Sequence, residues 1–117
     1  MRENVVRTKS FLFAVRVVRL CQYLQREKLE WVLSKQLLRS GSGVGALIRE
    51  AEHAESRSDF RHKMGVAQKE INETLYWLEL LKATNYLNDT QFDSVNKDAV
   101  ELIKLITSIL KSSKNNG

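Results

Sequence analysis

No proline occurs anywhere in the 117 residues, and only five residues are glycine. A fold rich in strands needs many tight turns, and glycine and proline are the residues that most often make them. The composition therefore predicts an all-α protein. A chain of this length forms one domain with one hydrophobic core, so we expect a single domain over residues 1–117.

Hydrophobic residues recur at helical spacing in four stretches separated by short polar segments. This periodicity predicts helices over residues of about 10–26, 29–55, 58–84 and 90–112. Ser10 and Ser58 are the expected N-caps of the first and third helices, and Asp89 or Thr90 that of the fourth. Four amphipathic helices with short connections favour an antiparallel up-down-up-down four-helix bundle.

The first and third predicted helices carry more apolar residues than one buried face requires. Such a surplus favours self-association, because large apolar patches on a soluble protein commonly mark interaction sites. A monomer with scattered hydrophobic side chains on its surface would have the same composition. We therefore expect a homo-oligomer, with the monomer as the alternative.

Three glycines lie close together in the segment SGSGVG, at positions 41, 43 and 45. A phosphate-binding loop would need a preceding strand and a following Lys-Ser or Lys-Thr pair, and the sequence offers neither. A helix break is the second interpretation, because glycine costs roughly 1 kcal/mol in a helix interior. The hydrophobic positions on both sides keep one helical phase, however, which predicts a continuous helix. Gly41 and Gly45 then form a helix-packing notch, which Trp77, Tyr76 or a neighbouring subunit would fill.

Carboxylates and histidines in the middle of the chain have spacings that occur in metal-binding bundles: Glu50, His53, Asp59, His62, Glu70 and Glu73. A metal site needs such side chains at the bundle centre, whereas the two histidines flank a predicted helix corner. The single cysteine, Cys21, lies on an apolar stripe and is interpreted as a core residue. We therefore expect no enzyme activity, no cofactor and no bound metal, with a metal-dependent enzyme as the least favoured alternative.

The net charge of +5 and an isoelectric point near 9.5 make the chain moderately basic. Lys and Arg side chains can contact phosphate groups of nucleic acids. The candidates for such contacts are Arg16, Arg19, Lys35, Arg39, Arg49, Arg57, Arg61, Lys63 and Lys69. Glutamates are interleaved with them, so a solvated face with ordinary ion pairs along the helices is the alternative.

No apolar run reaches the roughly 18 residues that a transmembrane helix needs, so we expect no membrane association. Residues 1–9 are too polar for a signal peptide, and a lone cysteine fits a reducing compartment. The expected location is the cytoplasm.

Three stretches, VLSKQLLRSGSGVGALIREA, SDF and AQKEINETLYWLELL, resemble a bacterial four-helix-bundle family encoded in intervening sequences of 23S rRNA genes. That family was once described as a ribosomal protein family, and its relatives include the accessory variability protein of diversity-generating retroelements. The resemblance implies a barrel-like homopentamer without catalytic activity. In the retroelement relatives the basic barrel binds a reverse transcriptase and nucleic acid. The sequence departs from the common pattern at Gly43, where Ser is usual, and at Leu47, where Asn is usual.

Charge and resemblance together favour a non-enzymatic, oligomeric helical bundle that binds the backbone of RNA or DNA through a basic surface. Such a protein would be an accessory to an RNA-related or reverse-transcriptase process. The alternative is a protein-interaction scaffold that binds no nucleic acid.

Overall fold

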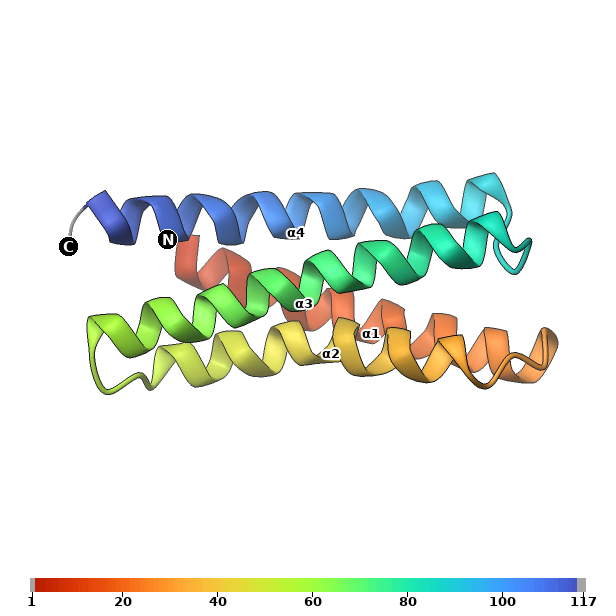
Figure 1. Cartoon of the computed structure of the whole chain (residues 1–117), viewed down its shortest axis with the longest axis horizontal. Helices are drawn as coiled ribbons and strands as arrows, with labels where there is room; N and C mark the ends of the chain where they lie inside the picture. Colours follow the sequence, from red (N-terminus) through yellow and green to blue (C-terminus); the bar gives the residue numbers. More distant parts are fainter. Residues whose placement is uncertain (1, 116–117) are drawn as a thin grey trace.

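The structure, a computed structural model, describes the backbone of residues 2–115 and the side chains of residues 4–113. The described backbone forms four helices and no strand: α1 (Arg2–Glu27), α2 (Leu33–Glu52), α3 (Arg57–Ala83) and α4 (Asp89–Asn115). The helices lie side by side along a molecule 46 Å long, and their connections alternate between its two ends (Figure 1). The all-α prediction is confirmed, and the arrangement is consistent with a four-helix bundle.

One hydrophobic core lies between the helices. Helices α1 and α3 each contact both α2 and α4. Every helix contributes fully buried side chains, such as Val17, Val44, Ile71 and Ile106. Along each helix the buried residues repeat at spacings of mostly three and four, which is the pattern of one inward-facing stripe per helix.

Helix α1 begins at Arg2, so the predicted start near Ser10 is wrong. Ser10 is buried inside the helix, where its hydroxyl donates to the Arg7 carbonyl at 3.1 Å. Val6 is also buried and extends the apolar stripe of Phe13 and Val17 by about two turns toward the N-terminus. In the sequence, a serine inside a helix looks like a helix start. The apolar stripe that continues before Ser10 is the better indication of where α1 begins.

Helix α2 begins at Leu33, not near Leu29. Leu29 has a positive φ of 55°, a left-handed conformation that prevents helix α1 from continuing into α2. The Glu30 carboxylate then accepts hydrogen bonds from the backbone N–H groups of Val32, Leu33 and Ser34 at 3.2, 3.0 and 2.7 Å. The side chain therefore caps α2 from ahead of its first turn and fixes where the helix starts.

The predicted cap of the third helix is displaced by two residues. Helix α2 ends at Glu52, before the predicted 55, and α3 begins at Arg57. Its N-cap is Ser56, whose hydroxyl accepts from the Asp59 backbone N–H at 3.0 Å, so Ser58 is not the cap. Neighbouring serines offer the same chemistry, and the local sequence does not distinguish them.

The predicted cap of the fourth helix, Asp89 or Thr90, is wrong by one or two residues. Asn88 precedes α4, and its Oδ1 accepts from the Gln91 backbone N–H at 2.8 Å. The Gln91 side chain accepts in return from the Asn88 backbone N–H at 2.9 Å, which completes a reciprocal capping box. At the other end of this connection Asn85 is left-handed, with φ of 69°, and ends α3.

Helix α2 runs unbroken through all three clustered glycines, as predicted. A Cβ at Gly41 would lie 2.8 Å from Val17 Cγ2, and a Cβ at Gly45 would lie 3.4 Å from the Ser10 carbonyl oxygen. Both glycines therefore lie against α1. The interpretation that an aromatic ring of the third helix fills the notch is wrong, because α1 occupies that space.

Candidate functional site

Part of the outer side of α1 is apolar. Phe11 and Leu12 are 54% and 57% exposed, and Val18 is exposed beside them, with Val15 half-buried. We call these four residues the α1 apolar strip. Three of them, Phe11, Val15 and Val18, line a hollow on the α1 surface together with Arg19. The inner face of α1 fills its part of the core, whereas Phe11 and Leu12 keep more than half of their surface in water, although the Arg49 guanidinium of α2 lies over the Phe11 ring.

The connection between α1 and α2 is also apolar and exposed. Leu29 and Val32 are 74% and 73% exposed, and Trp31 is about half exposed. Three large hydrophobic side chains in water at one end of the molecule extend the exposed apolar surface beyond α1. Such surface is typical of a binding or assembly site.

Four of the predicted phosphate-contacting cations are held in contacts within the chain. Arg16 bonds Asp98 at 2.7 Å across α1 and α4. Arg39 pairs with both Glu70 and Glu73 of α3, and Lys63 pairs with Glu50 at 3.1 Å. The fourth is Arg49, whose guanidinium lies 5.5 Å from the centre of the Phe11 ring. A nucleic acid would have to displace these partners, so the four are weaker candidates than their charge alone suggests.

The other predicted cations do not form one patch. Arg19 is exposed beside the α1 apolar strip, and Lys35, Arg61 and Lys69 are exposed without an ion pair in the described part of the chain. Lys35 lies in the first turn of α2 and Arg61 in the second turn of α3. Those two helix starts lie at opposite ends of the molecule (Figure 1).

The corner between α2 and α3 is mixed in charge. Arg57 and Arg61 are exposed there, and the nearby hollow is lined by both cations and carboxylates: Arg49, Glu50, His53, Glu55, Asp59 and Lys63. The structure therefore places the corner cations among acidic groups, which lowers the positive potential that the sequence suggested.

Sequence reasoning missed a row of lysines on α4. Lys97, Lys104 and Lys111 are exposed, and none makes an ion pair with a residue whose side chain the structure describes. Their spacing of seven residues places them on one side of the helix. That spacing is visible in KDAVELIKLITSILK and was the signal that could have found them.

The structure does not bring the predicted metal-type residues into one site: Glu50, His53 and Asp59 line the hollow at the α2–α3 corner, whereas Glu70 and Glu73 meet Arg39. Among residues 4–113, no three His, Cys, Asp or Glu side chains are placed so that they could hold a metal ion. Glu73 instead accepts from the Trp77 indole N–H at 2.8 Å and pairs with Arg39, as does Glu70. These carboxylates hold α2 and α3 together.

The single cysteine is a buried thiol. Desolvation by burial, with the Glu30 carboxylate as a smaller cause, raises the pKa of Cys21 from 9.0 to about 12. The thiol donates to the Ser34 carbonyl at 3.2 Å. A neutral, hydrogen-bonded thiol is a poor nucleophile, so Cys21 acts as a packing residue between α1 and α2.

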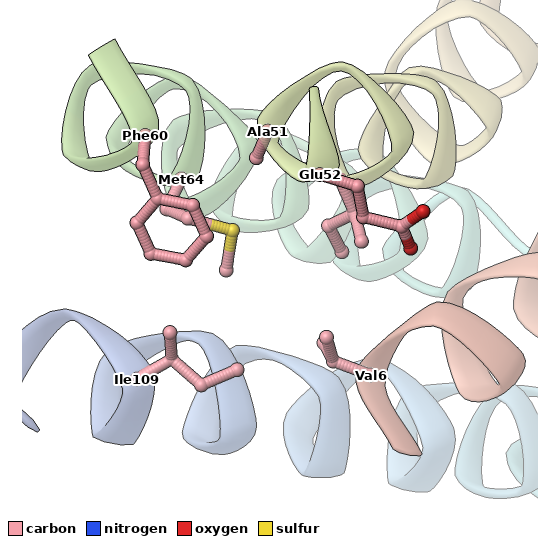
Figure 2. A pocket seen from close by; sticks show the side chains of 7 residues that line it. Val6, Ala51, Glu52, Phe60, Met64 and Ile109 are labelled. Atoms are coloured by element: carbon pink, nitrogen blue, oxygen red, sulfur yellow. The ribbon is translucent and has the colours of Figure 1, made fainter. Parts of the chain in front are cut away.

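An apolar cavity of about 290 Å³ lies near one end of the molecule, between side chains of all four helices (Figure 2). Its one charged lining residue is Glu52, which pairs with Arg7 at 3.1 Å. The remaining lining is Val6, Ile48, Ala51, Phe60, Met64 and Ile109. This lining is part of the core and offers few polar groups to orient a substrate.

None of the helices within residues 2–115 is both long enough and apolar enough to cross a membrane.

The fold and these surfaces define a small all-helical protein of the four-helix-bundle class. Residues 2–108 match the family described as 23S rRNA-intervening sequence protein, and the chain belongs to that family. The predicted family membership is thereby confirmed, whereas the relation to the retroelement accessory protein stays a prediction.

A solved relative supports the fold. The chain is 54% identical to a protein with unknown function from the S23 ribosomal protein family of Bacteroides thetaiotaomicron VPI-5482, known from a crystal structure at 1.70 Å resolution. The two structures superpose with a TM-score of 0.94, over 95% of this chain and 99% of that chain. No curated protein matches the chain.

Proposed function

We propose that this protein is a non-enzymatic, self-assembling, antiparallel up-down-up-down bundle that binds the phosphate backbone of RNA or DNA in the cytoplasm. It would serve as an accessory to an RNA-related or reverse-transcriptase process, as the relation to the retroelement accessory protein implies. The proposal has two parts, assembly and nucleic-acid binding, and different residues support them.

Uncompensated positive charge is the observation that carries the binding part. Exposed cations without an ion pair in the described structure outnumber exposed carboxylates in the same state. The cations are Arg19, Arg26, Lys28, Lys35, Arg49, Arg61, Lys69, Lys97, Lys104 and Lys111, and the carboxylates are Glu27, Glu55, Glu79 and Asp93. Such a surplus attracts polyanions and supplies the contacts that dominate non-specific nucleic-acid affinity.

The α1 apolar strip supports the assembly part. Exposed Phe11, Leu12 and Val18 can be covered by a second copy of the chain, which would lower the cost of leaving them in water. The family resemblance implies five subunits around a barrel. In such an assembly the cations of several subunits would act on one polyanion together, which raises the overall affinity.

A protein-interaction scaffold is the alternative function. The exposed Leu29, Trp31 and Val32 at the α1–α2 connection favour it, because aromatic and aliphatic side chains are the usual anchors of protein interfaces. A partner bound there would be insensitive to salt, whereas a nucleic acid bound through phosphates would not.

Light scattering on a size-exclusion eluate tests the proposal. The sample is run with and without 23S rRNA fragments, at low and at high salt. We expect a particle several times the 13.5 kDa chain mass that shifts with RNA at low salt and returns at high salt. An oligomer that is indifferent at low salt both to RNA and to a DNA duplex run in the same way would exclude the nucleic-acid function and leave the scaffold.

A further inference from the structure

The outer face of α4 differs from the other cationic surfaces in its regularity. Each of Lys97 and Lys104 stands two residues before a buried residue of the same helix, and Lys111 stands two residues after one. Two residues correspond to about 200° around an α-helix, so the three lysines face directly away from the core. They stand about 10.5 Å apart along the axis, a straight row of about 21 Å.

The acidic groups near this row are few. Glu101 lies on the same side of α4, but Lys9 of α1 holds it at 2.8 Å. Asp93 stands one turn before Lys97 and makes no ion pair in the described structure. The row therefore keeps a positive charge along most of its length, unlike Arg16, whose guanidinium is bound by Asp98.

We propose that Lys97, Lys104 and Lys111 form the principal contact surface for the phosphate backbone of a nucleic-acid duplex. This inference rests on the proposed nucleic-acid binding and names the surface that performs it. Lysine is a flexible point charge that contacts phosphates without reading bases, so the binding is independent of sequence.

The chemistry of the row favours a duplex over other polyanions. None of the exposed large hydrophobic side chains of residues 4–113 lies on α4, so the row has no apolar anchor for a protein partner. It also has no exposed aromatic ring on which unpaired bases could stack, as single-strand binders use. A rigid row of about 21 Å spans roughly six base pairs of a B-form DNA duplex, at 3.4 Å per pair, and somewhat more of an A-form RNA duplex.

The test compares two triple variants that remove the same charge. One is Lys97→Gln/Lys104→Gln/Lys111→Gln, and the other is Lys35→Gln/Arg61→Gln/Lys69→Gln, from the exposed cations of α2 and α3. Fluorescence anisotropy measures binding of each protein to a 20-base-pair RNA duplex, the DNA duplex of the same sequence and one strand alone, over a range of salt concentrations. Circular dichroism and light scattering verify that each variant keeps its helix content and mass.

We expect the α4 variant to lose about three units from the slope of log K against log salt for each contacting subunit, and the α2/α3 variant to lose less than one. At about 0.9 unit of slope per phosphate contact, the three lysines of one subunit contribute about 2.7 units, so between 50 and 200 mM salt the wild type would lose about 40-fold more affinity than the α4 variant. The RNA and DNA arms show which duplex binds more tightly.

Three results would overturn the inference, and they differ in what else they contradict. An α2/α3 variant that loses as much slope as the α4 variant would refute the α4 surface and leave nucleic-acid binding in place. Tighter binding of the single strand than of either duplex would refute the inference that the ligand is a duplex. A wild type that binds none of the probes at low salt would refute the proposed function as well.

Discussion

Helices α1 and α4 are neighbours in the bundle, yet their outer faces are opposite in character. The outer face of α1 carries the exposed side chains of Phe11, Leu12 and Val18, with Val15 half-buried beside them. The outer face of α4 carries lysines at regular spacing and no exposed large hydrophobic residue within residues 4–113. The inner faces of the two helices are alike, because each buries one apolar stripe in the same core.

This difference indicates that the outer face of α1 is covered in the native protein, whereas the outer face of α4 is in contact with water. An apolar outer face lowers its free energy by being covered, whereas a row of lysines would lose hydration if it were covered without anionic partners. In the assembly that we propose, α1 therefore lies at subunit contacts and α4 remains in water. The predictions below test that division, from the largest expected effect to the smallest.

Charging the α1 apolar strip should dissociate the proposed oligomer. In the variant Leu12→Lys/Val18→Lys, two ammonium groups would have to be buried unpaired at each subunit contact, which costs several kcal/mol per contact. Both positions are exposed in the single chain, so its fold should be unchanged. Light scattering should give the 13.5 kDa monomer, with the helical circular dichroism of the wild type.

The matched control charges the other outer face. Lys104→Glu/Lys111→Glu alters the same number of exposed residues on α4, and its mass should equal that of the wild type. If this variant dissociates while the α1 variant stays assembled, the division between the two faces is reversed.

Helix α1 packs so closely against Gly41 of α2 that a larger residue at position 41 should destabilise the protein. In Gly41→Ala the new methyl would meet Val17 Cγ2 at 2.8 Å, and a β-branched side chain in a packed core has little room to move. We expect a loss of about 1–3 kcal/mol in the free energy of unfolding, measured by urea denaturation.

Gly43→Ala is the control on the same helix. Its Cβ would meet only Glu70 Oε2 at an ordinary 3.7 Å, so the gain in helix propensity should stabilise the protein by up to about 1 kcal/mol. Equal effects at the two glycines would contradict the close approach of α1 to Gly41.

Cys21 should make stability fall at alkaline pH. Its thiol is an acid whose pKa is raised from 9.0 in the unfolded chain to about 12 in the fold. Above the unfolded value the unfolded chain releases the proton and the folded chain keeps it, so stability is full below pH 9 and declines as the pH rises towards 12. Urea denaturation at several pH values should show this decline, and Cys21→Ala should lack that part of it. Identical pH dependence in both proteins would contradict the burial of the thiol.

The ion pair between α1 and α4 should contribute least. Arg16 and Asp98 are each 42% exposed, so a double-mutant cycle with Arg16→Ala and Asp98→Ala should give a coupling of about 0.2–1 kcal/mol. The coupling should shrink in 1 M salt, where the Debye length is about 3 Å. A larger coupling that resists salt would show that this contact, and not apolar burial, holds α1 against α4.

The sequence was sufficient for the fold class because a 3.6-residue period without proline has few alternatives. It was insufficient for the helix ends, which depend on single side chains. Glu30 caps α2 from outside the helix, and Ser56, Ser58 and Ser10 look equally able to cap. Only the three-dimensional placement decides which of them meets free backbone N–H groups.

The candidate site was predicted less well, because a list of cations does not show their partners. Arg39 lies 31 and 34 residues from Glu70 and Glu73 in sequence and pairs with both. Arg49 rests on Phe11 of another helix. Such long-range contacts between charges cannot be read from the sequence. The seven-residue period of the α4 lysines can be read from it, but it lies outside the Arg-rich stretch on which the prediction concentrated.

The most direct test of the central claim is hydroxyl-radical footprinting of Phe11, which is 54% exposed in the single chain. The oxidation rate of its ring is compared between the wild type and Leu12→Lys/Val18→Lys, quantified by mass spectrometry of the Phe11-containing peptide of each protein. We expect strong protection of Phe11 in the wild type and its loss in the variant, because a neighbouring subunit covers the ring only in the wild type. Equal oxidation rates in both proteins would show that the outer face of α1 is open to water in the native protein and would contradict the account.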